Sequence, residues 1–286
     1  MRYFVVVLAL VVLVALPAGA IPQYYQFNLA ALGKGNADAN AGGDSPYGYW
    51  GGGLFSQGSV TASFTSPTIG AVNSAYGDAA ASVPFTIGTG GGANESWSGA
   101  EARIGQPPLT PQQLDLDTNV RQASAVFLLL NTFWGVDGAS GARIDVVLTF
   151  ASSATVTYGL FGNSDVRDHN YSLPLTYTNT INSSMHNTGG TYRASVNQQQ
   201  FLGQILGGGS HDVRRDAIAL FIDPAFWGDT LIKISILDNG GWPGEPNGPS
   251  TVWLWGATVS SVPEPSTYMM MGAGMALIGL RLRRRR

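Results

Sequence analysis

Short apolar runs separated by turn residues recur along the middle of the chain and predict β-strands. Val, Ile, Thr and aromatic residues are enriched in these runs, while Gly, Pro, Asn and Asp lie between them. Between the apolar segments at the two ends, no stretch repeats with the 3.6-residue period of a helix. The predicted strands are residues 59–64, 83–87, 114–120, 125–130, 144–150, 155–160, 217–222, 231–237 and 251–259. This pattern predicts an all-β chain folded as an antiparallel β-sandwich.

The apolar segment at the N-terminus has the layout of a secretory signal peptide. Arg2 supplies a positive charge, residues 3–16 are apolar, and small residues follow to Ala20. Signal peptidase would read Ala18 and Ala20, which predicts a signal peptide at residues 1–20 and Ile21 as the first mature residue. A membrane-spanning helix is the alternative, but fourteen apolar residues are few for one.

The apolar segment near the C-terminus predicts a short transmembrane anchor. Residues 268–280 are apolar, and thirteen residues at about 1.5 Å rise cover roughly 20 Å of a hydrocarbon core that is ~30 Å thick. Flanking residues and the stems of the arginines can lengthen the span. The arginines would lie on the cytoplasmic side and stall transfer, which leaves the rest of the chain outside. This cluster comprises Arg281, Arg283, Arg284, Arg285 and Arg286.

Pro263 and Pro265 flank Glu264 just before the apolar run and keep this stretch extended. The Pro-Glu-Pro motif, the short hydrophobic helix and the terminal arginines at residues 262–286 together resemble the PEP-CTERM sorting signal. The resemblance implies an exported bacterial protein that is processed by exosortase, a membrane-embedded cysteine protease or transpeptidase. Its other implied partners are signal peptidase, the general secretion machinery and, transiently, the inner membrane. Its implied destination is the cell surface or an exopolysaccharide matrix; a plain tail anchor without processing is the alternative.

Without its two targeting segments, the chain is acidic and free of thiols. Nine basic and 17 acidic residues remain between Ile21 and Val262, so the net charge of this part is near −8. Such a charge disfavours nucleic acid and anionic membrane surfaces as partners. The chain has no cysteine, which excludes disulfides and thiolate metal sites. We expect one domain at residues 21–261, irregular and rich in Gly, Ala and Asn within residues 21–58.

A second resemblance concerns the predicted sandwich itself. Its motifs come in the order found in exported proteins with a galactose-binding-like jelly-roll fold, and those domains commonly bind carbohydrate, often with a structural calcium ion. The motifs lie at residues 83–85, 127–135, 162–168, 234–239 and 254–259. The resemblance therefore implies a polysaccharide ligand.

The densest polar cluster follows the predicted strand at residues 155–160. Asn163, Asp165 and Asp168 offer the oxygen ligands that calcium prefers, with Arg167 between them. Two other interpretations remain open. Arg167 can pair with an acid while the aspartates cap turns, which would fix a connection without any ligand, or the loop can contact a sugar directly. The spacing matches no EF-hand loop.

Tryptophans next to glycines are the candidates for a glycan platform. Trp134 and Trp242 are the preferred pair, and Trp227 has the same kind of neighbourhood. Trp253 and Trp255 instead alternate on a predicted strand, which points both to one face and indicates a place in the core.

The sequence contains few signs of catalysis. It has no Gly-x-Ser-x-Gly elbow and no His-Glu-x-x-His zinc motif. Acidic pairs occur at Asp115 with Asp117 and at Asp212 with Asp216, but a glycosidase needs its carboxylates roughly 5–9.5 Å apart across a cleft. We therefore expect a non-enzymatic surface or matrix protein that binds glycan. A polysaccharide hydrolase and a purely structural matrix protein remain the alternatives.

Overall fold

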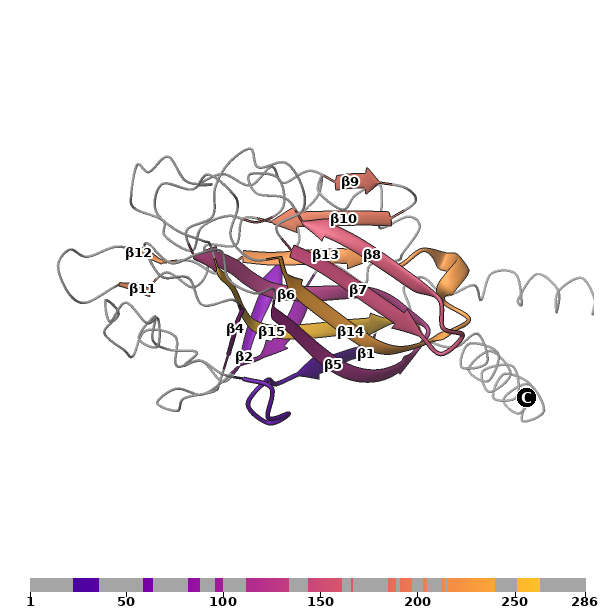
Figure 1. The fold of residues 1–286 in the computed structure, drawn as a ribbon, viewed down its shortest axis with the longest axis horizontal. Coiled ribbons are helices and arrows are strands. Elements are labelled where there is room, and N and C mark those ends of the chain that lie inside the picture. Colours follow the sequence, from indigo (N-terminus) through magenta and orange to yellow (C-terminus); the bar gives the residue numbers. More distant parts are fainter. Residues whose placement is uncertain are drawn as a thin grey trace, which may run out of the picture.

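The computed structural model describes the strands of the protein and a few of its turns (Figure 1). The described residues are 23–35, 59–63, 82–87, 96–99, 112–133, 144–160, 166, 185–188, 191–196, 203–204, 212–213, 216–239 and 251–262. All strand pairs among them are antiparallel. The predicted all-β, antiparallel fold is confirmed.

Two larger sheets stack on each other and two short hairpins accompany them. The seven-stranded sheet contains, in spatial order, β1 (Gln23–Phe27), β15 (Thr251–Ser261), β6 (Ala123–Phe133), β13 (Asp216–Phe221), β10 (Thr191–Val196) and β9 (Met185–Thr188), with β4 (Trp97–Ser98) also on β15. The four-stranded sheet contains β5 (Gln112–Arg121), β14 (Thr230–Asp238), β7 (Ile144–Phe150) and β8 (Thr155–Leu160). The hairpins pair β2 (Ser59–Ser63) with β3 (Ser82–Thr86) and β11 (Gly203–Gln204) with β12 (Asp212–Val213). A 3-10 helix, η2 (Pro224–Phe226), connects β13 to β14.

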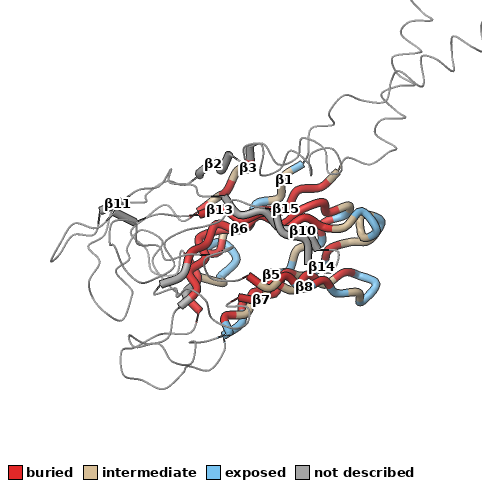
Figure 2. The backbone as a smooth tube through the Cα atoms, turned by 90° about the horizontal axis from the view of Figure 1, so that it is seen from above, coloured by how far each residue is buried: buried red, intermediate tan, exposed pale blue. Residues whose placement is uncertain are grey.

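The four-stranded sheet has one buried and one solvent-facing side. Along β7, Ile144, Val146, Leu148 and Phe150 are buried, and the residues between them are half-buried. This period of two places the apolar residues toward the seven-stranded sheet, where they form the main core. Figure 2 shows β5, β7, β8 and β14 as one layer and β6, β13 and β15 as the other. The Tyr158 hydroxyl joins the layers by donating to the carbonyl of Phe221 at 2.7 Å.

The central strands of the seven-stranded sheet, β15, β6 and β13, are buried on both sides where their side chains are described. Every described side chain of β6 and β13 is buried, which explains why their sequences read as continuous apolar runs. On the side away from the main core, β3 crosses β15: a Cβ placed on Gly256 would lie 3.3 Å from the carbonyl oxygen of Thr86. The Thr258 hydroxyl donates to the Pro84 carbonyl at 2.6 Å. The β2–β3 hairpin therefore adds a third layer to the sandwich.

All nine predicted runs form strands, and the bounds of β7 and β8 agree with the prediction to the residue. The sequence analysis missed β1, β4, β9, β10, β11 and β12. The predicted signal peptide and the predicted hydrophobic helix at residues 268–280 lie outside the described residues. Within the described ranges, no helix has the length and apolar character needed to cross a membrane. The galactose-binding-like character of the sandwich stays a prediction.

Candidate functional site

The strands that precede several predicted ligand-binding segments finish at one end of the sandwich. Thr251 pairs with Phe133, and Ile144 pairs with both Asp238 and Leu160. These residues define what we call the loop end, on the left of Figure 1. Each predicted site follows a strand that finishes there: Trp134 comes directly after β6, Asn163 three residues after β8, and Trp242 four residues after β14.

The predicted ligand residues themselves lie outside the described part of the chain. This holds for Trp134 and Trp242, and for the loop residues Asn163, Asp165, Arg167 and Asp168. In the ranges that are described, no group of three or more His, Cys, Asp or Glu side chains is placed to hold a metal ion. A calcium site in the 163–168 loop therefore stays a prediction.

A buried aspartate connects the two large sheets at the loop end. Asp238 is fully buried at the end of β14, and its Oδ2 accepts a hydrogen bond of 2.9 Å from the backbone N–H of Val252 on β15. Gly99 lies against the same carboxylate and donates its N–H to the Val252 carbonyl at 2.9 Å. A Cβ on Gly99 would overlap the Asp238 carboxylate, so this position has room only for glycine. The three residues hold the two large sheets together at the loop end.

A second buried aspartate has a structural partner at the same end. The Asn131 Nδ2 donates to Asp216 Oδ2 at 2.7 Å, and the Asp216 backbone N–H donates to Asn131 Oδ1 at 3.0 Å. Both side chains are buried. The reciprocal pair links the end of β6 to the start of β13 and gives the buried carboxylate of Asp216, one member of the predicted Asp212–Asp216 pair, a hydrogen-bonded place in the fold.

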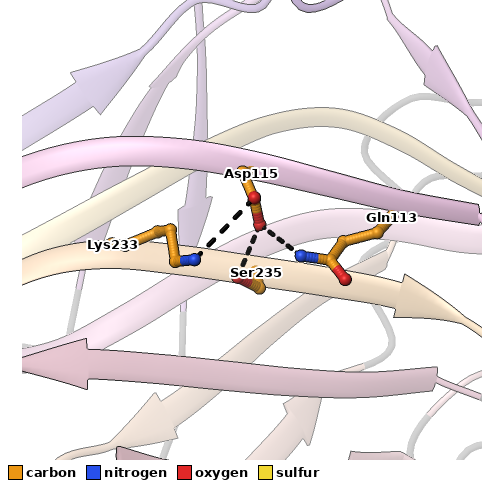
Figure 3. A network of polar contacts seen from close by, with 4 residues as sticks. All are labelled: Gln113, Asp115, Lys233 and Ser235. Atoms are coloured by element: carbon orange, nitrogen blue, oxygen red, sulfur yellow. Dashed lines mark hydrogen bonds and ion pairs between the residues drawn. The ribbon is translucent and has the colours of Figure 1, made fainter. Parts of the chain in front are cut away.

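The remaining acidic pair, Asp115 with Asp117, lies on the outer face of the four-stranded sheet, and Figure 3 shows the polar partners of Asp115. Asp115 accepts hydrogen bonds from the Ser235 hydroxyl at 2.6 Å and from Gln113 Nε2 at 2.7 Å, and Lys233 Nζ lies 3.8 Å from its other oxygen. Partial burial raises the pKa of Asp115, but the two hydrogen bonds and the nearby lysine outweigh it, so the pKa lies below its ordinary value. Asp115 is therefore ionised at neutral pH, the wrong form for a general acid.

Sequence reasoning missed this polar network because its members come from two strands. Gln113 and Asp115 are on β5, whereas Lys233 and Ser235 are on β14. The register that sets Ser235 opposite Asp115 could not be read from the sequence. The only available signal was the alternation of polar with apolar residues along each strand.

The described tryptophans belong to the body of the fold. Trp253 and Trp255 are buried and stack with their ring centroids 5.1 Å apart, which confirms the prediction that they lie in the core. Trp253 Nε1 donates to the hydroxyl of buried Ser96 at 2.7 Å. Trp227 is half-buried, packs against the main core and donates its Nε1 to the Ile222 carbonyl at 3.0 Å.

The opposite end of the sandwich carries both ends of the folded chain. The first residue of β1, Gln23, pairs with the last residue of β15, Ser261. The next residue, Val262, donates its N–H to the Gln122 carbonyl in the β5–β6 turn at 3.0 Å. The last described residue is thus still bonded to the sheet. We call this end, which also includes η2, the tail end.

Residues 261–286 match the family model of the PEP-CTERM protein-sorting motif. The chain carries a PEP-CTERM sorting motif. The motif indicates an exported protein that is targeted to exosortase, as the sequence analysis expected, and it includes Pro263, Glu264, Pro265 and the five arginines between Arg281 and Arg286. Comparison with curated proteins and with solved structures gives no match. The match begins at the last residue of β15, so the sorting motif follows the sheet without a linker.

Proposed function

We propose that this chain is a non-enzymatic protein of the bacterial cell surface or exopolysaccharide matrix whose sandwich binds glycan at its loop end. The observation that carries the proposal is the sorting motif at residues 261–286, directly continuous with the last strand of the fold. The motif accounts for export and processing. We assign glycan binding, the role of the protein after delivery, to the sandwich.

The acidic residues of the sandwich support a non-enzymatic role. Asp115 is held ionised by Ser235 and Gln113, and Asp216 is buried in a reciprocal pair with Asn131. Asp238 is buried against Gly99 and bonded to a backbone N–H. Each of these carboxylates contributes to the fold, whereas an acid catalyst needs a carboxyl group that can exchange its proton with the substrate.

The arrangement of strand ends supports glycan binding at the loop end. Trp134, Trp242 and the polar segment at residues 163–168 all join the described fold there. A sugar ring binds well between aromatic faces and planar polar side chains, because it presents apolar C–H groups on its faces and hydroxyls at its rim. Loops that are held by a rigid scaffold commonly carry the binding residues of a protein.

Glycan binding can be tested with residues 21–262 on an array of bacterial polysaccharides, with and without a calcium chelator. We expect binding that falls at least about tenfold, or ~1.4 kcal/mol, in Trp134→Ala and in Trp242→Ala. Trp227→Phe is the matched control, because it alters a tryptophan at the tail end and should leave binding unchanged. Absence of binding to every polysaccharide would reject the glycan role, and insensitivity to chelator would reject calcium.

Export and sorting can be tested separately in a producing cell. Replacing Pro263, Glu264 and Pro265 by alanine should leave the protein in the inner-membrane fraction, with its C-terminal arginines still attached. The unaltered protein should appear outside the cell envelope without them. Identical distribution of the two proteins would contradict the assigned processing role of the motif.

A further inference from the structure

The predicted signal peptide and the predicted membrane anchor precede and follow the described fold at neighbouring points. Gln23 and Ser261 are register partners in the β1–β15 pair, so the chain enters and leaves the sandwich side by side. Val262 remains hydrogen-bonded to the Gln122 carbonyl. The predicted membrane anchor therefore follows the sandwich at the tail end, the same end at which the predicted signal peptide precedes it.

The connection to the C-terminal apolar run is short. Five residues, 263–267, separate Val262 from Tyr268. Fully extended, they reach roughly 18 Å. The polar headgroup layer takes up about 5–8 Å of that length on each side of a bilayer. The tail end is thus held within about 13 Å of the headgroups while the tail is intact.

The sandwich is longer than this connection, residues 263–267, which we call the tether. The 11 residues of β15 run from the loop end to the tail end, a distance of roughly 36 Å at about 3.3 Å per residue. For the loop end to approach the membrane, the sandwich would have to turn over on a connection about half its own length. That rotation brings the broad faces of the sheets against the headgroups before the loop end can reach them.

We propose that, until the tail is cut, the tail end is held against the lipid surface and the loop end faces away from it. The proposal rests on the proposed function, because it takes the sorting tail to be inserted in the membrane. It assigns the tail end as a membrane-facing surface and gives the predicted glycan loops free access to the exterior before release.

The described surface of the tail end suits this position. Pro224 and Ala225 in η2 are exposed, and Ile232 is 39% exposed where the register of β14 shifts. Uncharged groups lie near headgroups without the cost of stripping water from ions. The charged residues described at the same end are Asp223, Asp229 and exposed Arg121. The Asp223 carboxylate accepts the Ala225 N–H, and the Asp229 carboxylate accepts backbone N–H groups from Ser152 and Thr230.

Because residues 21–262 are acidic, attachment of the sandwich to an anionic lipid surface depends on the tether. A net charge near −8 is repelled by anionic lipid, so the surface alone gives no lasting attachment. The connection through residues 263–267 then sets the orientation, and its removal releases the protein. Lengthening this connection should remove the orientation without removing the attachment.

A labelling experiment can measure the orientation, because the chain has no cysteine that would react in the background. The chain without its predicted signal peptide, residues 21–286, is reconstituted in vesicles of zwitterionic lipid with a nitroxide quencher in the headgroup layer. A fluorophore is attached through Ala225→Cys at the tail end or Gln112→Cys at the loop end; both positions are exposed. We expect the headgroup quencher to reduce the fluorescence at Ala225→Cys at least threefold more than at Gln112→Cys.

The control inserts twenty Gly and Ser residues after Val262, a flexible linker with a mean span of about 25 Å. With it, the two labels should be quenched alike while the protein still floats with the vesicles. Equal quenching without the insertion, stronger quenching at Gln112→Cys, or quenching at neither position would overturn the proposed orientation and leave the proposed function standing. A chain that does not float with the vesicles would overturn both.

Discussion

At the loop end, the contact between the two large sheets depends on three individual residues. Gly99, Asp238 and Val252 form one contact in which a backbone N–H, a carboxylate and the absence of a side chain are each required. None of this is visible in the sequence, where Gly99 is one of 38 glycines. Its importance comes from a neighbour 139 positions away along the chain.

Gly99→Ala should destabilise the protein strongly. The new methyl group would lie 2.8 Å from the Cβ of Asp238 on the four-stranded sheet, while the Gly99 N–H is bonded to the Val252 carbonyl on the seven-stranded sheet. We expect the free energy of unfolding to fall by about 2–3 kcal/mol, measured by urea denaturation of residues 21–262. Gly228→Ala is the control: a Cβ added there would have nothing within 4 Å, so its effect should stay within about 0.5 kcal/mol.

Asp115 makes part of the stability depend on pH. Its pKa is lowered in the folded protein, so its contribution is present above the pKa of the unfolded chain and is lost as pH falls through the folded pKa. Asp115→Asn should therefore reduce stability at pH 7 and have a smaller effect at pH 3, as measured by thermal unfolding. The contribution is modest, because the Asp115 side chain is 39% exposed.

The matched control for Asp115 is Asp117→Asn. It removes the same charge from the same strand but leaves the hydrogen bonds from Ser235 and Gln113 to Asp115 in place. Ser235→Ala should raise the pKa of Asp115, which a carboxyl NMR titration can follow. An unchanged Asp115 titration in Ser235→Ala would show that the network has been assigned the wrong role.

At the scale of elements, the sequence predicted strands whose side chains make the core and missed those that depend on distant partners. Strands such as β7 have an apolar residue at every second position over seven residues, which suffices to recognise them. By contrast, β1 has the sequence Gln-Tyr-Tyr-Gln-Phe and becomes a strand by pairing with β15, more than 200 positions later. Strand direction, which gathers the predicted ligand segments at one end, follows from the same long-range pairing.

Removing β1 should expose the edge of β15 in the seven-stranded sheet. Tyr24 packs edge-on against Phe127 with ring centroids 6.4 Å apart, and its burial raises the pKa of Tyr24 to about 12. Deleting residues 21–27 loses this contact and the backbone pairing to β15, so we expect a loss of about 3 kcal/mol or more. Unpaired β15 should also promote association between molecules, detected by light scattering.

Unchanged unfolding and a monodisperse solution after the deletion would contradict the pairing of β1 with β15. A matched variant keeps residues 21–27 but replaces Gln23 by alanine, a change at an exposed side chain that retains the backbone pairs. That variant should unfold as the original protein does. The comparison separates the pairing of the strand from the chemistry of its first side chain.

For the whole molecule, the fold and the sorting motif meet at one residue. The sorting-motif match starts at Ser261, which is also the last residue of β15, and Val262 still bonds to the Gln122 carbonyl. The sequence alone placed the motif and the body next to each other. That the final strand lies inside the sheet, between β1 and β6, required the structure.

This junction predicts where the chain can be cut without harm. Ending the protein after Val262 keeps every described backbone bond of β15, so residues 21–262 should unfold at the same urea concentration as a version that retains residues 263–267.

Ending the protein after Thr258 instead removes the pairs of Val259, Ser260 and Ser261 with both β1 and β6. It also removes the hydroxyl contact between Ser124 and Ser260 at 2.9 Å. We expect this shorter protein to lose about 3–5 kcal/mol, because it gives up buried Val259 and several backbone hydrogen bonds. Processing anywhere beyond Val262 then releases an intact sandwich, whereas equal stability of the two truncated proteins would mean that the end of β15 contributes nothing to the fold.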